Sequence, residues 1–291
     1  HLRHATLTAA AVLLFSACLL SAGAQAVSFT RYNDFTEAQA AAKKTGLPIL
    51  IDFYTDWCKY CKQMDTITFK DPAVVEWINR NVIFARVNSD NESGSRTEFA
   101  ESYGVRGYPT FALVKADGAD IDRAVGFLDA SRFIQTFTDY RNDRNTLGDY
   151  LRRLEETPSA KLHYDIAEKY RWRARSKEAE AHFAQAIDLD KNNETGIKVD
   201  SRWSLADLAR RDGNYDLAIE RYKSVIGAFP EHEYVPDAHL YIGLCLRDKG
   251  ELQMAVERFE LFKELFPENE DFAYADKKIK QIKEDLKTKA P

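Results

Sequence analysis

The residues best suited to chemistry are two cysteines separated by two positions. Cys58 and Cys61 enclose Lys59 and Tyr60, and Trp57 stands directly before them. A thiolate is the nucleophile of disulfide exchange, and a second thiol within reach resolves the mixed disulfide that forms. Metal sites share the same C-x-x-C spacing, so the pair alone leaves redox chemistry and metal binding open.

The segments on either side predict how these cysteines are positioned. Residues 48–54 (PILIDFY) form a short apolar run typical of a buried parallel strand, and a helical pattern begins by Cys61. A cysteine at a helix start meets unpaired N–H groups and the helix dipole, which favour its thiolate. We therefore expect Cys58 to attack a substrate disulfide and Cys61 to resolve the product, with the Lys59 charge supporting the thiolate.

The first half of the chain alternates between helical and strand patterns. Helices are expected at residues 34–45, 72–81, 98–103 and 131–140, and strands at residues 48–54, 82–87, 110–115 and 124–127. The last two strands flank the turn Ala116-Asp117-Gly118, which indicates a hairpin. This order predicts a mixed α/β domain with helices on the faces of a sheet.

With these motifs in place, residues 27–140 resemble the thioredoxin superfamily. Leu50–Tyr54 followed by Asp56-Trp57-Cys58 matches the strand and active-site entry of that family, and Gly107-Tyr108-Pro109-Thr110 matches its cis-proline loop. The runs at residues 61–64 and 68–74 are most similar to the branch that includes the C-terminal periplasmic domain of the transmembrane thiol:disulfide interchange protein. The resemblance implies a thioredoxin fold and disulfide exchange with proteins.

The resemblance also implies roles for individual residues. Asp52 falls on the buried acid of the family, where burial raises the pKa of a carboxyl group and allows it to relay the proton of Cys61. Pro109 would form a cis bond that shapes the substrate groove, and Tyr108 would expose its backbone to the substrate chain. Trp57 would shield the disulfide and belong to the contact surface.

Two departures from the usual family pattern bear on the chemistry. Lys59 and Tyr60 replace Gly-Pro between the cysteines, and Thr66 stands where a helix-kinking proline is usual. The intervening dipeptide modulates thiolate stability and reduction potential, so the direction of electron flow is not fixed by the motif. We expect the reductase or isomerase direction.

The second half, from about residue 146, is helical and repetitive. Six positions recur 37 residues apart, namely Gly213, Tyr215, Ala218, Tyr222, Phe229 and Pro230 with Gly250, Leu252, Ala255, Phe259, Phe266 and Pro267. An earlier copy runs through His163, Ala167, Tyr170, Ala179 and Phe183. This pattern is typical of tetratricopeptide repeats and predicts about three copies, closed by a polar capping helix over residues 271–287.

The N-terminal segment has the pattern of an export signal. A positive start at Arg3 precedes an apolar run over residues 9–20 and the small-x-small site Ala24-Gln25-Ala26. A cleavable signal peptide over residues 1–26 predicts a periplasmic protein, since the repeats also resemble those of Gram-negative envelope assembly proteins. The alternative is a membrane anchor, either through the uncleaved segment or through a lipid on Cys18.

Composition excludes several other classes of function. The net charge of −5 over 291 residues argues against nucleic acid as the main partner. Glycine-rich phosphate loops are missing from the sequence, so reducing equivalents should arrive by thiol exchange and not from a cofactor. Cys245 is expected to be a small buried hydrophobe. The four histidines of the repeats, which lack ligand spacing, are assigned no metal role (His163, His182, His232 and His239).

The sequence thus predicts a signal peptide (1–26), a thioredoxin-like domain (27–145) and a tetratricopeptide-repeat domain (146–291). The favoured function is an exported thiol-disulfide oxidoreductase whose repeats recruit an unidentified protein or peptide. One alternative is a scaffold for envelope protein assembly, in which the redox fold serves recognition. Another is a metal-handling protein that uses the cysteine pair as ligands.

Overall fold

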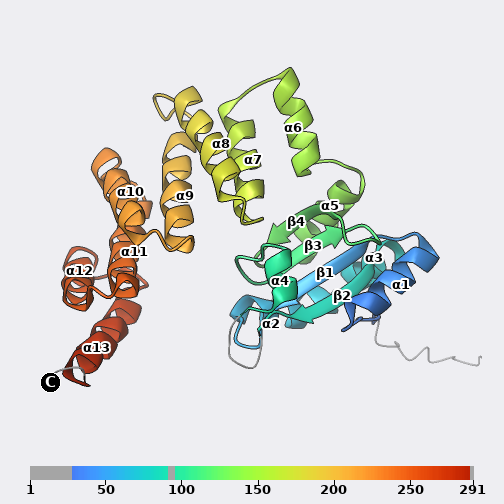
Figure 1. Ribbon diagram of the computed structural model, residues 1–291, viewed down its shortest axis with the longest axis horizontal. Coiled ribbons are helices and arrows are strands. Elements are labelled where there is room, and N and C mark those ends of the chain that lie inside the picture. The colour runs from blue at the N-terminus through green and yellow to red at the C-terminus, as the bar shows by residue number, and fades with distance from the viewer. Residues whose placement is uncertain (1–27, 91–95, 289–291) are drawn as a thin grey trace, which may run out of the picture.

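The structure, a computed structural model, describes residues 28–90 and 96–288 of the chain. A four-stranded sheet with its helices comes first, and a series of helices without strands follows (Figure 1). This order confirms the α/β and then all-α architecture predicted from the sequence. The expected signal peptide at residues 1–26, including Cys18, lies outside the described residues.

The sheet has the strand order β2-β1-β3-β4. Strands β1 (Ile49–Tyr54) and β2 (Ile83–Asn88) run parallel, whereas β3 (Thr110–Val114) is antiparallel to β1. Strand β4 (Asp120–Val125) pairs antiparallel with β3 through the expected hairpin. The carboxyl ends of β1 and β2 therefore meet the start of β3 at one edge of the sheet.

The last strand differs from the prediction, which placed it at residues 124–127. Ala119 already closes the hairpin turn, because its carbonyl accepts a hydrogen bond from the amide of Lys115 at 2.8 Å. Pairing resumes directly afterwards, at Asp120. The sequence pattern missed this part of β4 because Asp120 and Asp122 are charged and do not resemble strand residues. Both carboxylates pair with basic side chains at or just beyond the end of a helix in the second half of the chain, as described below.

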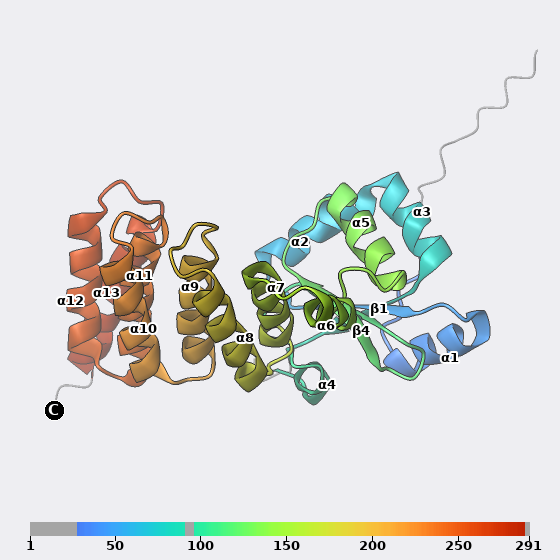
Figure 2. The same ribbon diagram turned by 90° about the horizontal axis from the view of Figure 1, so that it is seen from above.

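Helices cover both faces of the sheet. They are α1 (Phe35–Thr45), α2 (Lys59–Thr66), α3 (Pro72–Asn81), α4 (Glu98–Ser102) and α5 (Ala130–Arg141), with a 3₁₀ turn η1 (Thr68–Lys70). Figure 2 shows α2, α3 and α5 on one face and α1 and α4 on the other. Each face has its own apolar core, and both cores share the side chains of the central strands.

Strand β1 contributes to both cores because successive side chains of a strand point to opposite faces. Ile51 and Phe53 pack in the core beneath α1 and α4, whereas Leu50 packs with α2, α3 and α5. The alternation assigns Asp52 to the same face as Leu50. An acid therefore enters an apolar layer that also contains the fully buried rings of Phe111 and Phe133.

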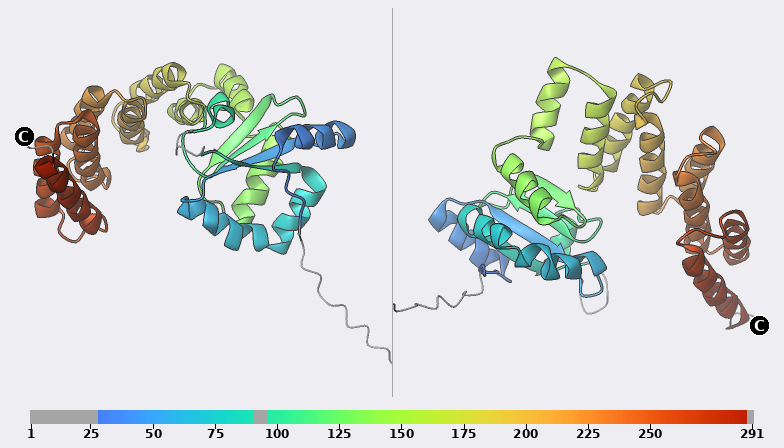
Figure 3. Two further views of the ribbon diagram at one scale, coloured as in Figure 1. Left: turned by 60° about the horizontal axis from the view of Figure 1, so that its bottom comes forward. Right: turned by 180° about the vertical axis from the view of Figure 1, so that it is seen from behind.

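The remaining helices are α6 to α13, and the Figure 1 labels follow their order in the chain. Their bounds are α6 (Leu147–Glu156), α7 (Ala160–Arg171), α8 (Ser176–Leu189), α9 (Ile197–Arg211), α10 (Tyr215–Ala228), α11 (Tyr234–Lys249), α12 (Leu252–Leu265) and α13 (Phe272–Thr288). From α7 onward each helix packs on the next. Figure 3 shows the resulting curved row leading away from the sheet.

The positions that recur at 37-residue spacing form the contacts between these helices. Ala218 and Ala255 are fully buried, as are the aromatic residues Tyr222 and Phe259. Gly243 packs directly under Phe259, since a Cβ at Gly243 would lie 2.7 Å from the ring. Small residues thus stand where helices touch and aromatic rings fill the space between them, as the sequence pattern predicted.

A buried charged network joins the sheet to helix α7. Asp122 of β4 is fully buried, and its Oδ1 lies 3.0 Å from both Lys169 Nζ and Arg173 Nη2. Its Oδ2 accepts a hydrogen bond of 2.6 Å from the amide of Leu147 at the start of α6. Asp120 adds a bond of 2.8 Å from Arg173 Nε. Buried charges of this kind require partners, so β4 and α7 depend on each other.

Candidate active site

The two cysteines stand at the start of α2, immediately after β1. Cys58 is the N-cap residue, and its Sγ accepts a hydrogen bond of 3.0 Å from the amide of Cys61. The two residues form a disulfide, and both side chains are almost fully buried, Cys58 being 4% exposed. When the bond is reduced, the same amide and the helix dipole favour negative charge on Cys58.

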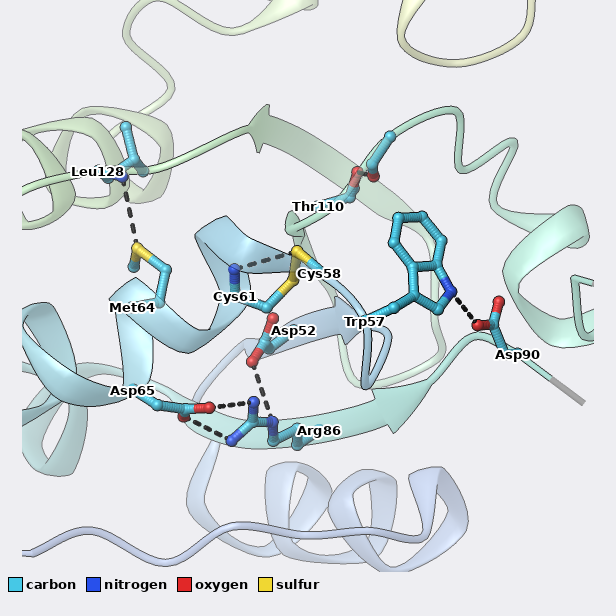
Figure 4. Close-up of a disulfide and its surroundings, with 11 residues drawn as sticks. Asp52, Trp57, Cys58, Cys61, Met64, Asp65, Arg86, Asp90, Thr110 and Leu128 are labelled. Atoms are coloured by element: carbon cyan, nitrogen blue, oxygen red, sulfur yellow. Dashed lines mark hydrogen bonds and ion pairs between the residues drawn. A yellow bond between two sulfur atoms is a disulfide. The ribbon is translucent and has the colours of Figure 1, made fainter. Parts of the chain in front are cut away.

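Asp52 lies directly beneath this disulfide (Figure 4). The carboxyl group is 1% exposed, and one oxygen, Oδ2, lies 3.3 Å from Arg86 Nε. The other oxygen, Oδ1, accepts no hydrogen bond from any described residue. In Figure 4 the carboxyl group stands between the disulfide and Arg86.

Burial raises the pKa of Asp52 to about 7, and the nearby Arg86 charge opposes part of this rise. The carboxyl group therefore changes its protonation state near neutral pH. A group with this property beside a thiol pair can accept or return a proton during exchange. The sequence predicted both the burial and the direction of the shift.

Arg86 is a site residue that the sequence analysis missed. Asp52 and Arg86 are direct partners in the register of the parallel strands β1 and β2, so their side chains leave the sheet on the same face. The guanidinium group also forms two hydrogen bonds with Asp65 of α2, at 2.6 and 2.8 Å, and stacks 4.2 Å above the Tyr54 ring. Only the strand pairing reveals this link, which joins Asp52 to the helix of the cysteines.

The predicted cis-proline loop lies at the same edge of the sheet. The Tyr108–Pro109 bond is cis, and the Thr110 hydroxyl donates a hydrogen bond of 2.7 Å to the Gly107 carbonyl. The Tyr108 ring meets the Trp57 ring edge to face, with centroids 5.8 Å apart. Strand order accounts for this meeting, because the end of β1 and the start of β3 adjoin.

The exposed surface beside the disulfide is aromatic. Trp57 is 69% exposed, and its indole Nε1–H donates a hydrogen bond of 2.5 Å to Asp90, which follows β2 (Figure 4). Tyr60 is 53% exposed and Lys59 is also exposed. Next to them is a pocket of 330 Å³ lined by Trp57, Asp90, Arg96, Arg106, Gly107 and Tyr108. An extended chain placed here would contact two aromatic rings together with the charged side chains of Asp90, Arg96 and Arg106.

Helix α2 ends at Thr66, the residue that departs from the expected family pattern. The Thr66 hydroxyl donates a hydrogen bond of 2.9 Å to the Lys62 carbonyl, and the helix stops there. The η1 turn follows at once and turns Phe69 into the core. A threonine that bonds back to its own helix bends it, so this segment is interrupted without a proline.

The remaining cysteine and histidines lie in the helical region. Cys245 is buried on α11, and burial raises the pKa of its thiol to about 12. His163 and His182 meet with Nδ1 atoms 3.0 Å apart, a contact that their spacing did not predict. Across residues 28–90 and 96–288, no group of three or more His, Cys, Asp or Glu side chains is arranged to hold a metal ion.

Within the part of the chain that the structure describes, every helix is too short or too polar to cross a bilayer.

Comparisons with known protein families agree with the two parts of the structure. Residues 35–141 match the family described as a thioredoxin-like domain. Residues 200–232 and 237–269 match the tetratricopeptide repeat. The chain joins a thioredoxin-like domain to tetratricopeptide repeats. The repeat family accounts for α9 to α12, and α7 and α8 precede them as another packed pair with Ala167, Ala179 and Phe183 fully buried.

Curated relatives match the thioredoxin-like domain. The thiol:disulfide interchange protein DsbD of Photorhabdus laumondii is 32% identical over 110 residues, which are 37% of this chain and 19% of that protein. DsbD of Klebsiella pneumoniae is 31% identical over 147 residues, 45% of this chain and 24% of that protein. The chain thus spans about a fifth of the length of the relatives it matches.

Solved structures are similar to the same region. A thioredoxin from Thermus thermophilus is 30% identical, with a TM-score of 0.34, and covers 38% of this chain and 86% of its own. The oxidised DsbD C-terminal domain of Neisseria meningitidis is 24% identical, with a TM-score of 0.33, over 38% of this chain and 99% of that one.

Replacing Asp52 by Asn tests the buried carboxyl group. Its pKa is about 7 in the folded protein and about 4 in the unfolded chain, so the folded state holds the proton more tightly. The wild type must therefore lose stability as pH rises from about 4 to about 7. We expect Asp52→Asn to remove this loss, which is at most about 4 kcal/mol.

The measurement is urea unfolding of both proteins at pH 4.5 and pH 8. The free energy of unfolding of Asp52→Asn minus that of the wild type should be larger at pH 8 than at pH 4.5. An equal difference at the two pH values would contradict the raised pKa. Asp65→Asn, which changes a more exposed carboxyl group in the same cluster, is the matched control.

Proposed function

We propose that this chain is an exported thiol-disulfide oxidoreductase that works in the reductase or isomerase direction on protein disulfides. The observation that carries the proposal is a C-x-x-C pair at a helix start above a buried carboxyl group that titrates near neutrality. The names of the curated relatives, thiol:disulfide interchange proteins, support the same chemistry. Export and a periplasmic location rest on the N-terminal sequence pattern and on the resemblance of the repeats to those of Gram-negative envelope assembly proteins.

The proposed exchange starts with the reduced pair. The Cys58 thiolate attacks one sulfur of the substrate disulfide, and the other substrate sulfur leaves as a thiolate. Asp52 then accepts the proton of Cys61, and the Cys61 thiolate attacks Cys58 Sγ. The second substrate sulfur leaves, and the Cys58–Cys61 disulfide remains. Two electrons pass to the substrate, whose thiolates take up protons from water and from Asp52.

The surrounding residues are proposed to hold and tune the substrate. Tyr108 and Pro109 would present an extended backbone edge to the substrate chain, and Trp57 would cover the reacting sulfurs. Lys59 is exposed beside Cys58 and would favour its thiolate, and Tyr60 adds an exposed ring to the contact surface. Another protein thiol would reduce the pair again.

The repeats are proposed to increase the local concentration of a partner. Tetratricopeptide repeats form curved surfaces that bind peptides or helices. A partner held there would meet Cys58 in an effectively intramolecular reaction. The proposal divides the chain into a redox domain over residues 27–145 and a repeat domain over residues 146–291.

Substituting Cys61 tests the exchange mechanism. Cys61→Ser removes the resolving thiol, so the mixed disulfide between Cys58 and a substrate should accumulate. Incubation with an oxidised peptide, followed by non-reducing electrophoresis and mass spectrometry, should reveal one adduct on Cys58. Cys58→Ser should form none, and Cys245→Ser should behave as the wild type because that thiol is buried. If Cys61→Ser forms no adduct, the proposed exchange mechanism is wrong.

The reduction potential of the pair tests the direction of electron flow. Equilibration of the wild type with glutathione and dithiothreitol buffers should give a potential near that of thioredoxin, about −270 mV. A buried acid beside the sulfurs opposes the thiolate form and so favours the disulfide. A value near about −120 mV, typical of a strong oxidant, would reverse the proposed direction.

A further inference from the structure

The loop that carries Tyr108 and Pro109 is held from outside by the repeat helices. It joins α4 to β3, and its residues Arg106 and Gly107 face the ends of α7 and α9. Arg106 and its partner Arg211 are 105 residues apart in the chain. These contacts join the proposed substrate surface directly to the repeat region.

Arg106 and the end of α9 bind each other in both directions. Arg211 Nη1 donates a hydrogen bond of 2.8 Å to the Arg106 carbonyl. In return, Arg106 Nη1 donates to Asp212 Oδ1 at 2.8 Å and to the Arg211 carbonyl at 3.3 Å. Both the backbone and the side chain of Arg106 are therefore fixed by α9. Hydrogen bonds with charged partners are among the stronger ones in proteins.

Trp172, at the end of α7, packs against the next residue of the loop. A Cβ at Gly107 would lie 3.3 Å from Trp172 Cζ3, so the ring and the loop backbone are in close contact. The Arg211 guanidinium group lies 5.1 Å from the centroid of the same ring. Arg211 thus touches the loop directly and also through Trp172.

Arg211 is itself held in place. Its Nε donates a hydrogen bond of 2.6 Å to Asp207 Oδ2, and Asp207 is almost fully buried on α9. Asp207 also accepts hydrogen bonds from Arg210 and Arg171, of 2.6 and 3.2 Å. A guanidinium group with this support has little freedom, so it can define the position of the loop it binds.

From these contacts we infer that Arg211 and Asp212 are positioning residues of the exchange site. They hold Arg106 and Gly107, which line the pocket beside Trp57 and Tyr108. A substrate chain lying along this loop depends on its position, whereas a small disulfide that reaches only the sulfurs does not. The inference rests on the proposed function and assigns the repeat domain a part in shaping the peptide-binding surface.

The test compares a peptide substrate with a small one in the full chain. Arg211→Ala should lower kcat/KM for reduction of a peptide disulfide by about tenfold, mainly through KM, because it removes a charged hydrogen bond. The rate with hydroxyethyl disulfide should stay within about twofold. Asp212→Ala, a milder change at a partly exposed residue, should shift the peptide reaction in the same direction.

Arg221→Ala is the matched control. Arg221 also donates to a carbonyl, that of Leu205 at 2.9 Å, and pairs with Glu180 at 2.8 Å, but both partners lie within the repeats. It should leave both reactions unchanged. The inference would be overturned if Arg211→Ala and Asp212→Ala both react with the two substrates at the wild-type kcat/KM. It would also be overturned if these variants lose kcat/KM equally for the peptide and for hydroxyethyl disulfide. If the wild type reduces neither substrate through Cys58, the proposed function fails instead.

Discussion

The buried carboxyl group of Asp52 imposes the strongest constraint on this molecule. One of its oxygens has no hydrogen-bond donor among the described residues, and the other has only the Arg86 charge at 3.3 Å. Burying such a group in an apolar layer costs folding free energy, so the surrounding packing must hold it in place. Strand alternation, the register of β1 with β2 and the position of α2 all serve to place it beneath the cysteine pair.

The thiol chemistry then follows from geometry at one edge of the sheet. Cys58 is at the helix start, where an amide and the helix dipole favour its thiolate, and Cys61 lies on the inner side near Asp52. The loop of Tyr108 and Pro109 meets them because β3 begins where β1 ends. Three segments far apart in the sequence thus form one surface, and the repeat helices support the third segment from behind.

Much of the site could be predicted because its signals are local. The spacing of Cys58 and Cys61, the apolar strand before them and the Tyr108-Pro109 pair are all visible in short windows of sequence. The recurrence at 37 residues likewise identified the repeats, since each copy is a local helix pair. The strand, the helix start and the repeats follow from chain periodicity, which acts over a few residues. The cis bond at Pro109 and the burial of Asp52 are instead implied by the resemblance to the thioredoxin superfamily.

The features that escaped prediction depend on which distant segments meet. Arg86 reaches Asp52 only because of strand register. The charged start of β4 is explained only by Lys169 of α7 and by Arg173, which follows that helix. The bond from Arg211 to the Arg106 carbonyl joins two parts of the chain whose docking no local pattern encodes. Long-range polar pairs of this kind can be identified only when the fold is known.

The most direct test of the account is to measure which thiol of the reduced protein is the nucleophile. Alkylation with limiting iodoacetamide at pH 7, followed by peptide mass spectrometry, compares Cys58 and Cys61 within one sample. The account predicts that Cys58 reacts first and that Cys61 stays largely unmodified, because only Cys58 occupies the helix start. Faster modification of Cys61, or equal rates for the two thiols, would contradict the assignment of attacking and resolving roles.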